Sequence, residues 1–238
     1  PTLLTKNNDT YIRTFQWSPD SKKIVYTDRK NRINLLDVSN KQLTNISQSL
    51  LGEARNVSFS PDNNWLTYSR VSDNNFSIVY VYDIAGKKEY PVTDKWYESY
   101  SPVFSTDGKY LVFTSARDFN PTYSQTEWNH VYNNMGGVYL ASKDTASPFM
   151  ETDAEVAIES TPAKADASKK DETKNEASTP VVKIDIEGIT DRIVKLPLPG
   201  SNYYDLYSDG TNVYYFTKGG MKMFDLKKQK EETVSDAA

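Results

Sequence analysis

Only one side chain in this 238-residue sequence, His130, has the ordinary pKa range of an acid–base catalyst near neutral pH. A single histidine and the absence of cysteine exclude multi-histidine metal sites, thiolate ligands, disulfides and a cysteine nucleophile. A histidine base also needs a nucleophile, and the Gly-x-Ser-x-Gly pentapeptide of α/β-type serine hydrolases does not occur. Gly-rich phosphate loops are missing as well. We therefore expect no catalytic residue, no metal and no cofactor.

His130 belongs to a stretch, residues 115–135, that concentrates charged and aromatic side chains. Such a mixture is typical of recognition surfaces, and long loops on rigid scaffolds often carry function. The alternative is an irregular loop whose aromatic residues cover the edge of a sheet. The candidates for lining a substrate channel or binding a partner are Arg117, Asp118, Tyr123, Trp128 and His130.

Three aspartates, Asp20, Asp62 and Asp107, recur at the end of Ser-Pro-Asp or Ser-Thr-Asp triplets. Repeated carboxylates could suggest calcium binding or acid–base chemistry. Because the triplet recurs with each repeat of the sequence, turn formation explains these residues better.

Internal repeats define the elements that must position these side chains. Residues 15–20 (FQWSPD) return as residues 57–62 and 102–107, with the serines 42 and then 45 residues apart. A fourth copy at residues 204–210 places its serine 103 residues further on, which is about two periods or one period plus an insertion.

Each copy is followed by further β-rich runs, so that a unit holds four strands in about 40–45 residues, the size of a β-propeller blade. We predict an all-β fold of about four four-stranded blades, an arc of a larger ring. One residue in the first strand of each blade shares a common register and is expected to fill the interfaces between blades. These residues are Trp17, Phe59, Phe104 and Leu206.

Residues 151–180 break the repeat, with no aromatic residue and eight acidic against four basic side chains. Such a composition predicts a disordered insertion in the third blade, and an acidic binding tail is the alternative. Leu4-Thr5 matches the closing strand of a blade, which suggests a blade upstream. The predicted boundaries are 1–7 for that strand, 8–47 for blade 1, 48–94 for blade 2, 95–150 with 181–199 for blade 3, and 200–238 for blade 4.

The overall charge argues against nucleic acid as a partner, because the formal net charge is −4. No run approaches the roughly 20 apolar residues of a membrane span. The sequence begins at Pro1 with neither an initiator methionine nor a signal peptide, and we interpret it as a processed or excised piece.

The Ser-Pro-Asp repeats resemble those of TolB, the prolyl oligopeptidases and tricorn protease. Three stretches are similar to tricorn-like proteases in particular, and together with the repeats the resemblance covers nearly the whole chain. They are residues 11–20 with 31–37, residues 115–123, and residues 184–194.

This resemblance implies both a fold and a function. Tricorn-like proteases carry two propellers, then a PDZ-like domain and core domains with a Ser/His catalytic set. The second propeller, seven-bladed in the archetype, filters and channels peptides. The chain would be a non-catalytic part of that propeller in a serine peptidase, gating peptide or polypeptide substrates and scaffolding the catalytic domains. Its partners would be the missing blades and catalytic domains of the same parent chain, with a homo-oligomer as a further expectation.

Two alternatives remain open at this stage. The chain could be a self-standing TolB-like propeller that binds a protein partner, or the lid of a prolyl oligopeptidase, of which residues 185–194 are not typical. We expect a cytoplasmic location, with the periplasm as the alternative because some bacterial relatives carry export signals.

Overall fold

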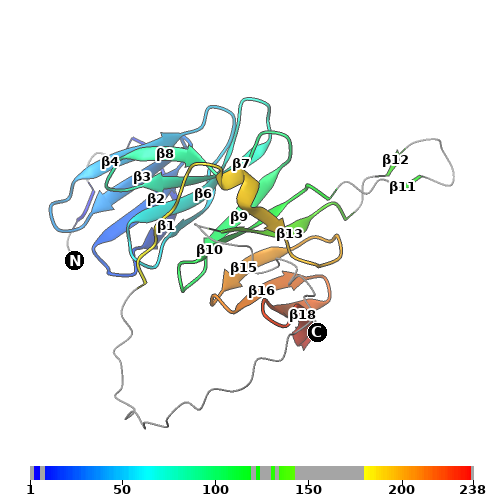
Figure 1. Cartoon of the computed structure of the whole chain (residues 1–238). Helices are drawn as coiled ribbons and strands as arrows, with labels where there is room; N and C mark the ends of the chain where they lie inside the picture. Colours follow the sequence, from blue (N-terminus) through cyan, green and yellow to red (C-terminus); the bar gives the residue numbers. More distant parts are fainter. Residues whose placement is uncertain are drawn as a thin grey trace, which may run out of the picture.

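The computed structural model describes residues 3–5, 9–118, 122–123, 130–131, 134–142 and 180–236. Except for Pro180, the predicted insertion at 151–180 lies outside the described residues. Strands dominate the rest, and Figure 1 shows four sheets arranged side by side in sequence order. The helical part of the described chain is a single 3-10 turn, η1 (Ile189–Arg192), and nothing in it has the length or apolar character of a membrane-crossing helix.

Each sheet has four antiparallel strands, and we call the sheets blades 1 to 4. Blade 1 holds β1 (Ile12–Trp17), β2 (Lys23–Asp28), β3 (Arg32–Asp37) and β4 (Leu43–Gln48). Blade 2 holds β5 (Arg55–Phe59), β6 (Trp65–Val71), β7 (Ser77–Asp83) and β8 (Lys88–Pro91). Blade 3 holds β9 (Ser99–Phe104), β10 (Tyr110–Ser115), β13 (Gly137–Ser142) and β14 (Ile193–Lys195). Blade 4 holds β15 (Tyr204–Ser208), β16 (Asn212–Thr217), β17 (Gly220–Asp225) and β18 (Lys230–Asp236). The prediction of an all-β fold with four four-stranded blades is confirmed.

The middle strands of the blades are apolar along almost their whole length because both faces of the sheet are covered. In β7, every residue from Ile78 to Tyr82 is buried. A single sheet cannot cover both of its own faces, so neighbouring blades must pack against it. Three clusters of buried side chains do this, between blades 1 and 2, 2 and 3, and 3 and 4.

Of the four residues predicted to share a register and fill blade interfaces, Trp17, Phe59 and Phe104 share it, whereas Leu206 lies in the bulge of β15. Three of the four pack between described blades. Phe59 and Phe104 are buried against the preceding blade, and Leu206 packs against the cluster between blades 3 and 4. Trp17 is 45% exposed and fills no interface between the described blades. Its face of blade 1 holds Ile24 and looks away from blade 2, so no described blade lies against it.

The Ser-Pro-Asp triplets form turns, as predicted. The Ser18 hydroxyl donates to Oδ1 of Asp20 at 2.6 Å, and this contact lowers the pKa of that carboxyl. Blades 2 and 3 repeat the arrangement, with hydroxyl-to-carboxylate distances of 2.6 and 2.7 Å. The turns also join neighbouring blades, since the amide of Asp20 donates to Oδ1 of Asn63 at 3.1 Å. These carboxylates therefore have a structural role.

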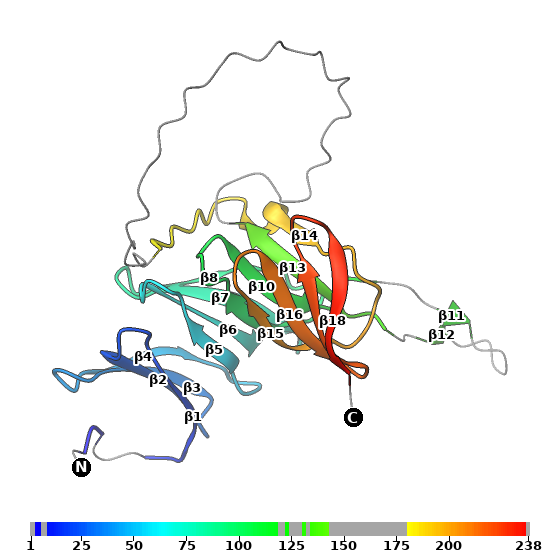
Figure 2. The ribbon, with the colours of Figure 1, turned by 90° about the horizontal axis from the view of Figure 1, so that it is seen from below.

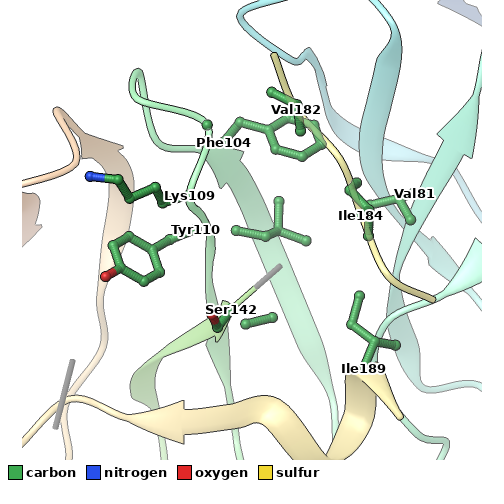
Figure 3. Close-up of a pocket in the computed structure, with 11 residues that line it drawn as sticks. Val81, Phe104, Lys109, Tyr110, Ser142, Val182, Ile184 and Ile189 are labelled. Carbon is green, nitrogen blue, oxygen red and sulfur yellow. The ribbon is translucent and has the colours of Figure 1, made fainter. Parts of the chain in front are cut away.

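A segment that we call the strap, residues 180–192, crosses the seam between blades 2 and 3. Its side chains alternate, with Val182, Ile184 and Ile186 turned inward and their neighbours exposed. Figure 3 shows strap residues facing Val81 and Phe104 around a small apolar cavity, which measures about 20 Å³. The space is about that of one water molecule, so the strap completes a packed core.

Candidate binding surface

Strand direction places the predicted loop at a defined end of the blades. In each antiparallel blade, the turn between the second and third strands lies at the same end as the connection to the next blade. We call this end the connection rim, and the end with the Ser-Pro-Asp turns the turn rim. The predicted loop joins β10 to β13, and the amide of Ala116 donates to the Glu98 carbonyl at 2.9 Å. The loop therefore leaves from the connection rim of blade 3.

Arg117, at the start of this loop, is held between two aromatic rings and a carboxylate. Its Nη2 lies 3.1 Å from Oδ2 of Asp94. The guanidinium carbon lies 5.9 Å from the ring centre of Tyr97 and 6.0 Å from that of Tyr139. Burial, with a smaller contribution from the charge of Asp118, raises the pKa of Tyr139 to about 12. Arg117 is thus fixed in position by cation–π and ionic contacts.

Asp118 contacts a different partner and helps to anchor the base of the loop. Its Oδ2 lies 2.5 Å from Nζ of Lys195 in β14, and its amide donates to the Met135 carbonyl at 3.2 Å. The connection from blade 3 to blade 4 closes the base from the other side, where the Ser201 amide donates to the Gly136 carbonyl at 2.9 Å. A Cβ on Gly136 would lie 2.4 Å from the Ser201 carbonyl oxygen, so this close approach requires glycine.

The remaining predicted residues are placed only in part. Tyr123 and His130 pair with each other in a two-stranded ribbon of β11 (Thr122–Tyr123) and β12 (His130–Val131). This ribbon lies apart from the four sheets in Figures 1 and 2. Trp128 lies outside the described residues. Arg117 and Asp118 are therefore the two candidates with defined side-chain contacts, and the role of the five residues stays a prediction.

Blade 2 carries a second stacked arginine, which the sequence did not reveal. The guanidinium carbon of Arg70 lies 4.5 Å from the ring centre of Tyr80, and Nη2 lies 2.9 Å from Oε2 of Glu89. The Tyr68 hydroxyl donates to the other oxygen of Glu89 at 2.5 Å. Tyr80 and Tyr139 are equivalent, because each pairs with the aromatic residue at the centre of the neighbouring strand. Arg70 lies within β6 and Arg117 follows the end of β10, so the two arginines reach equivalent tyrosines from different positions. Arg70, Tyr80 and Glu89 lie on three different strands, so no local sequence pattern indicates that they are in contact.

The first strands of the blades lie nearest one another and carry backbone bulges. In β5, β9 and β15 the bulge includes a residue with positive φ, namely Asn56, Ser101 and Asp205. Bulges bend a strand and redirect side chains. A cleft of about 480 Å³ lies where β5 and β9 meet, lined by polar residues that include Arg55, Asn56, Glu98 and Ser101. Within the described parts of the chain, no group of three or more acidic or histidine side chains could hold a metal ion.

Comparison with known proteins decides the family. The model of the tricorn protease second β-propeller domain matches residues 1–238, the whole chain. The chain belongs to this family. Among its relatives, Tricorn protease homolog 1 of Streptomyces coelicolor is 28% identical over 195 residues, or 78% of this chain and 17% of that protein. The Tricorn protease homolog of Saccharolobus solfataricus is 23% identical over 240 residues, or 94% of this chain and 20% of that protein.

Solved structures show the same fold. The crystal structure of tricorn protease aligns with 98% of this chain and 23% of its own length, with a TM-score of 0.75 and 13% identity. TolB from Acinetobacter baumannii aligns with 96% of this tricorn-family chain and 44% of its own length, with a TM-score of 0.55 and 17% identity. The chain thus spans about a fifth of the length of its tricorn relatives.

Proposed function

We propose that this tricorn-family chain is a non-catalytic propeller segment of a serine peptidase, which gates or channels peptide substrates and scaffolds the catalytic domains. The observation that carries the proposal is the family match over all 238 residues. It is supported by the four blades and by two relatives named as tricorn protease homologs, which are about five to six times longer than the matched part.

Two features of the structure fit a role in guiding extended chains. The polar cleft at the meeting of β5 and β9 offers side-chain partners to a passing peptide backbone. The loop after β10 begins at Arg117 and Asp118, both held by ionic contacts, so its orientation relative to blade 3 is defined at its base. A rigid base is what positions a binding loop on a scaffold.

The test compares long and short substrates in the full native protein. We expect Arg117→Ala with Trp128→Ala to change the processing of long peptides while short fluorogenic peptides are cleaved as before. Lys228→Ala, an exposed basic residue on the turn rim, is the control. Equal loss on long and short peptides would show that the loop supports folding, and no change on either would remove the loop from the gate.

The second candidate, a self-standing TolB-like binding module, has the fold likeness to TolB in its favour. The intact mass of the native gene product distinguishes the two. A mass several-fold above 27.1 kDa agrees with a segment of a multidomain peptidase, whereas a mass near 27.1 kDa contradicts it and favours the binding module.

A further inference from the structure

Several large apolar side chains are exposed together on the connection rim. Leu50 is 92% exposed and Leu51 55% in the connection from blade 1 to blade 2, and Trp96 is 80% exposed in the connection from blade 2 to blade 3. Phe76, in the turn between β6 and β7, lies at the same end of the blades. Between the strands at the opposite end, the described residues expose one large apolar side chain, Val181 of the strap. Concentrated exposure of this kind marks an interaction surface.

A cleft opens beside Leu50 and Leu51, next to the stacked arginine of blade 2. Its volume is about 470 Å³. Apolar groups contributed by Leu50, Leu51 and Val71 line part of it, and the Tyr80 ring contributes another part. Aromatic and aliphatic surfaces around a cleft take an apolar side chain well.

Two cations face the same cleft. Arg70 donates a hydrogen bond from Nη2 to Glu89, and its buried Nε has no hydrogen-bond partner among the described residues. Lys95 is more than half exposed, and its Nζ lies 2.7 Å from Oδ1 of Asp73, which is itself 76% exposed. An exposed pair of this kind is weak, so a carboxylate from another molecule can compete with Asp73 for Lys95.

We propose that this cleft binds a polypeptide segment in which a carboxylate side chain lies next to an apolar one. Leu50 and Leu51 contact the apolar side chain, while Arg70 and Lys95 receive the carboxylate. The apolar residues continue along the rim to Trp96, beyond the cleft, so the ligand is longer than a single amino acid. The inference rests on the proposed function and specifies the class of substrate that the propeller selects.

The test measures binding directly. Three fluorescein-labelled peptides share one Gly/Ser host sequence and carry Leu-Asp, Leu-Asn or Leu-Lys at the centre. Fluorescence anisotropy with the full native protein should give a dissociation constant for the Leu-Asp peptide at least about tenfold below that of the Leu-Asn peptide. The difference should shrink at high ionic strength, because an ionic contact at an open cleft is screened by salt.

Charge reversal at the cleft gives the sharper result. Lys95→Glu should weaken Leu-Asp binding at least about tenfold and strengthen Leu-Lys binding. Lys228→Glu is the matched control, since Lys228 is also an exposed lysine paired with an aspartate, Asp225, but lies on the turn rim. Leu51→Ser should lower the affinity for all three peptides. Val181→Ser, which changes an exposed apolar residue on the strap, should leave the three affinities unchanged.

Several outcomes would overturn the proposal. Equal affinity for the Leu-Asp and Leu-Asn peptides would show that Arg70 and Lys95 do not distinguish a carboxylate from a neutral amide. Absence of binding, together with protection of Lys95 from amine-reactive labelling in the native protein, would show that another domain covers the rim. Either result leaves the gating test at Arg117 and Trp128 intact. By contrast, selective binding of the Leu-Asp peptide would support this site. If the variants at Arg117 and Trp128 then had no effect on peptide processing, the gating role of the loop would be contradicted.

Discussion

At the scale of single residues, the blades use a buried tyrosine hydroxyl to fix the outer strand. The Tyr68 hydroxyl donates to Glu89 in blade 2, and the Tyr215 hydroxyl donates to Glu231 in blade 4 at 2.7 Å. Burial works to raise the pKa of Glu231, but the hydrogen bonds from Lys222 and Tyr215 lower it overall. Both glutamates occupy the second position of the fourth strand. The repeated contact connects the centre of a blade with its edge.

Removing one of these hydroxyls should therefore cost stability without opening a cavity. We expect Tyr68→Phe to lower the free energy of unfolding by about 1.5–3 kcal/mol, as is usual for a buried hydrogen bond to a charged group. Tyr214→Phe is the control, because its hydroxyl lies 3.4 Å from Asp209 on a partly exposed face and should contribute less than about 0.5 kcal/mol. Urea denaturation of the two variants checks this, and similar losses would show that the contact with Glu89 adds nothing.

At the scale of elements, the strap ties two blades together outside the regular strand order. Its Val182 amide donates to Oδ2 of Asp62 at 2.8 Å, and its Val182 carbonyl accepts from the Trp65 indole at 3.2 Å. Arg192 then donates to the Ser142 carbonyl at 3.2 Å, which secures the far end. Side chains of blade 2 thus bind both polar backbone groups of one strap residue.

Loosening the strap should destabilise the seam between blades 2 and 3. Ile189→Ala removes a buried side chain and should lower the free energy of unfolding by about 2–4 kcal/mol. Amide hydrogen exchange should rise in β7 and β10, which border the seam, more than in β2 or β16. Val181→Ser, at an exposed strap position, should leave exchange unchanged. A uniform rise in exchange across all four blades would show that the strap has no local role.

The strand pattern could be predicted from sequence because each repeat carries its own turn signal and its own apolar runs. Ser18, Ser60 and Ser105 mark the turns where the structure has them. Contacts between strands far apart in the chain carry no such local signal. Neither the Arg70–Glu89 ion pair nor the contacts of Arg117 with Asp94 and the two tyrosine rings were therefore predicted. The bulge at Asn56 was not predicted either, because a bulge is defined by how β5 pairs with β6. The exposed apolar residues of the connection rim, such as Leu50 and Trp96, were not predicted either, because their exposure depends on how the blades are arranged.

At the scale of the whole molecule, the two end blades present apolar faces that no described blade covers. On blade 1, Phe15 is 67% exposed and shares its face with Trp17. On blade 4, the Tyr204 and Phe216 rings stack at a centroid distance of 6.1 Å and are both exposed. The residues equivalent to Trp17 in blades 2 and 3, Phe59 and Phe104, are buried in the seams. The residues equivalent to Phe216 in blades 1 to 3 are the smaller Thr27, Ser69 and Thr114, so the face of blade 4 is more aromatic than the interior faces. Both end faces expose apolar area that a further blade could cover, which agrees with an arc of a larger ring.

The uncovered end faces predict self-association of the isolated 238-residue chain, because exposed apolar sheet faces associate in water. Phe216→Ser, combined with Phe15→Ser, should raise the monomer fraction seen by sedimentation velocity at micromolar concentration. Phe76→Ser is the matched control, since Phe76 is 39% exposed and Phe216 37%, but Phe76 lies on the connection rim. If the control raises the monomer fraction as much, the rim and not the end faces causes association. A chain that stays monomeric at every concentration would mean that the end faces do not behave as blade interfaces.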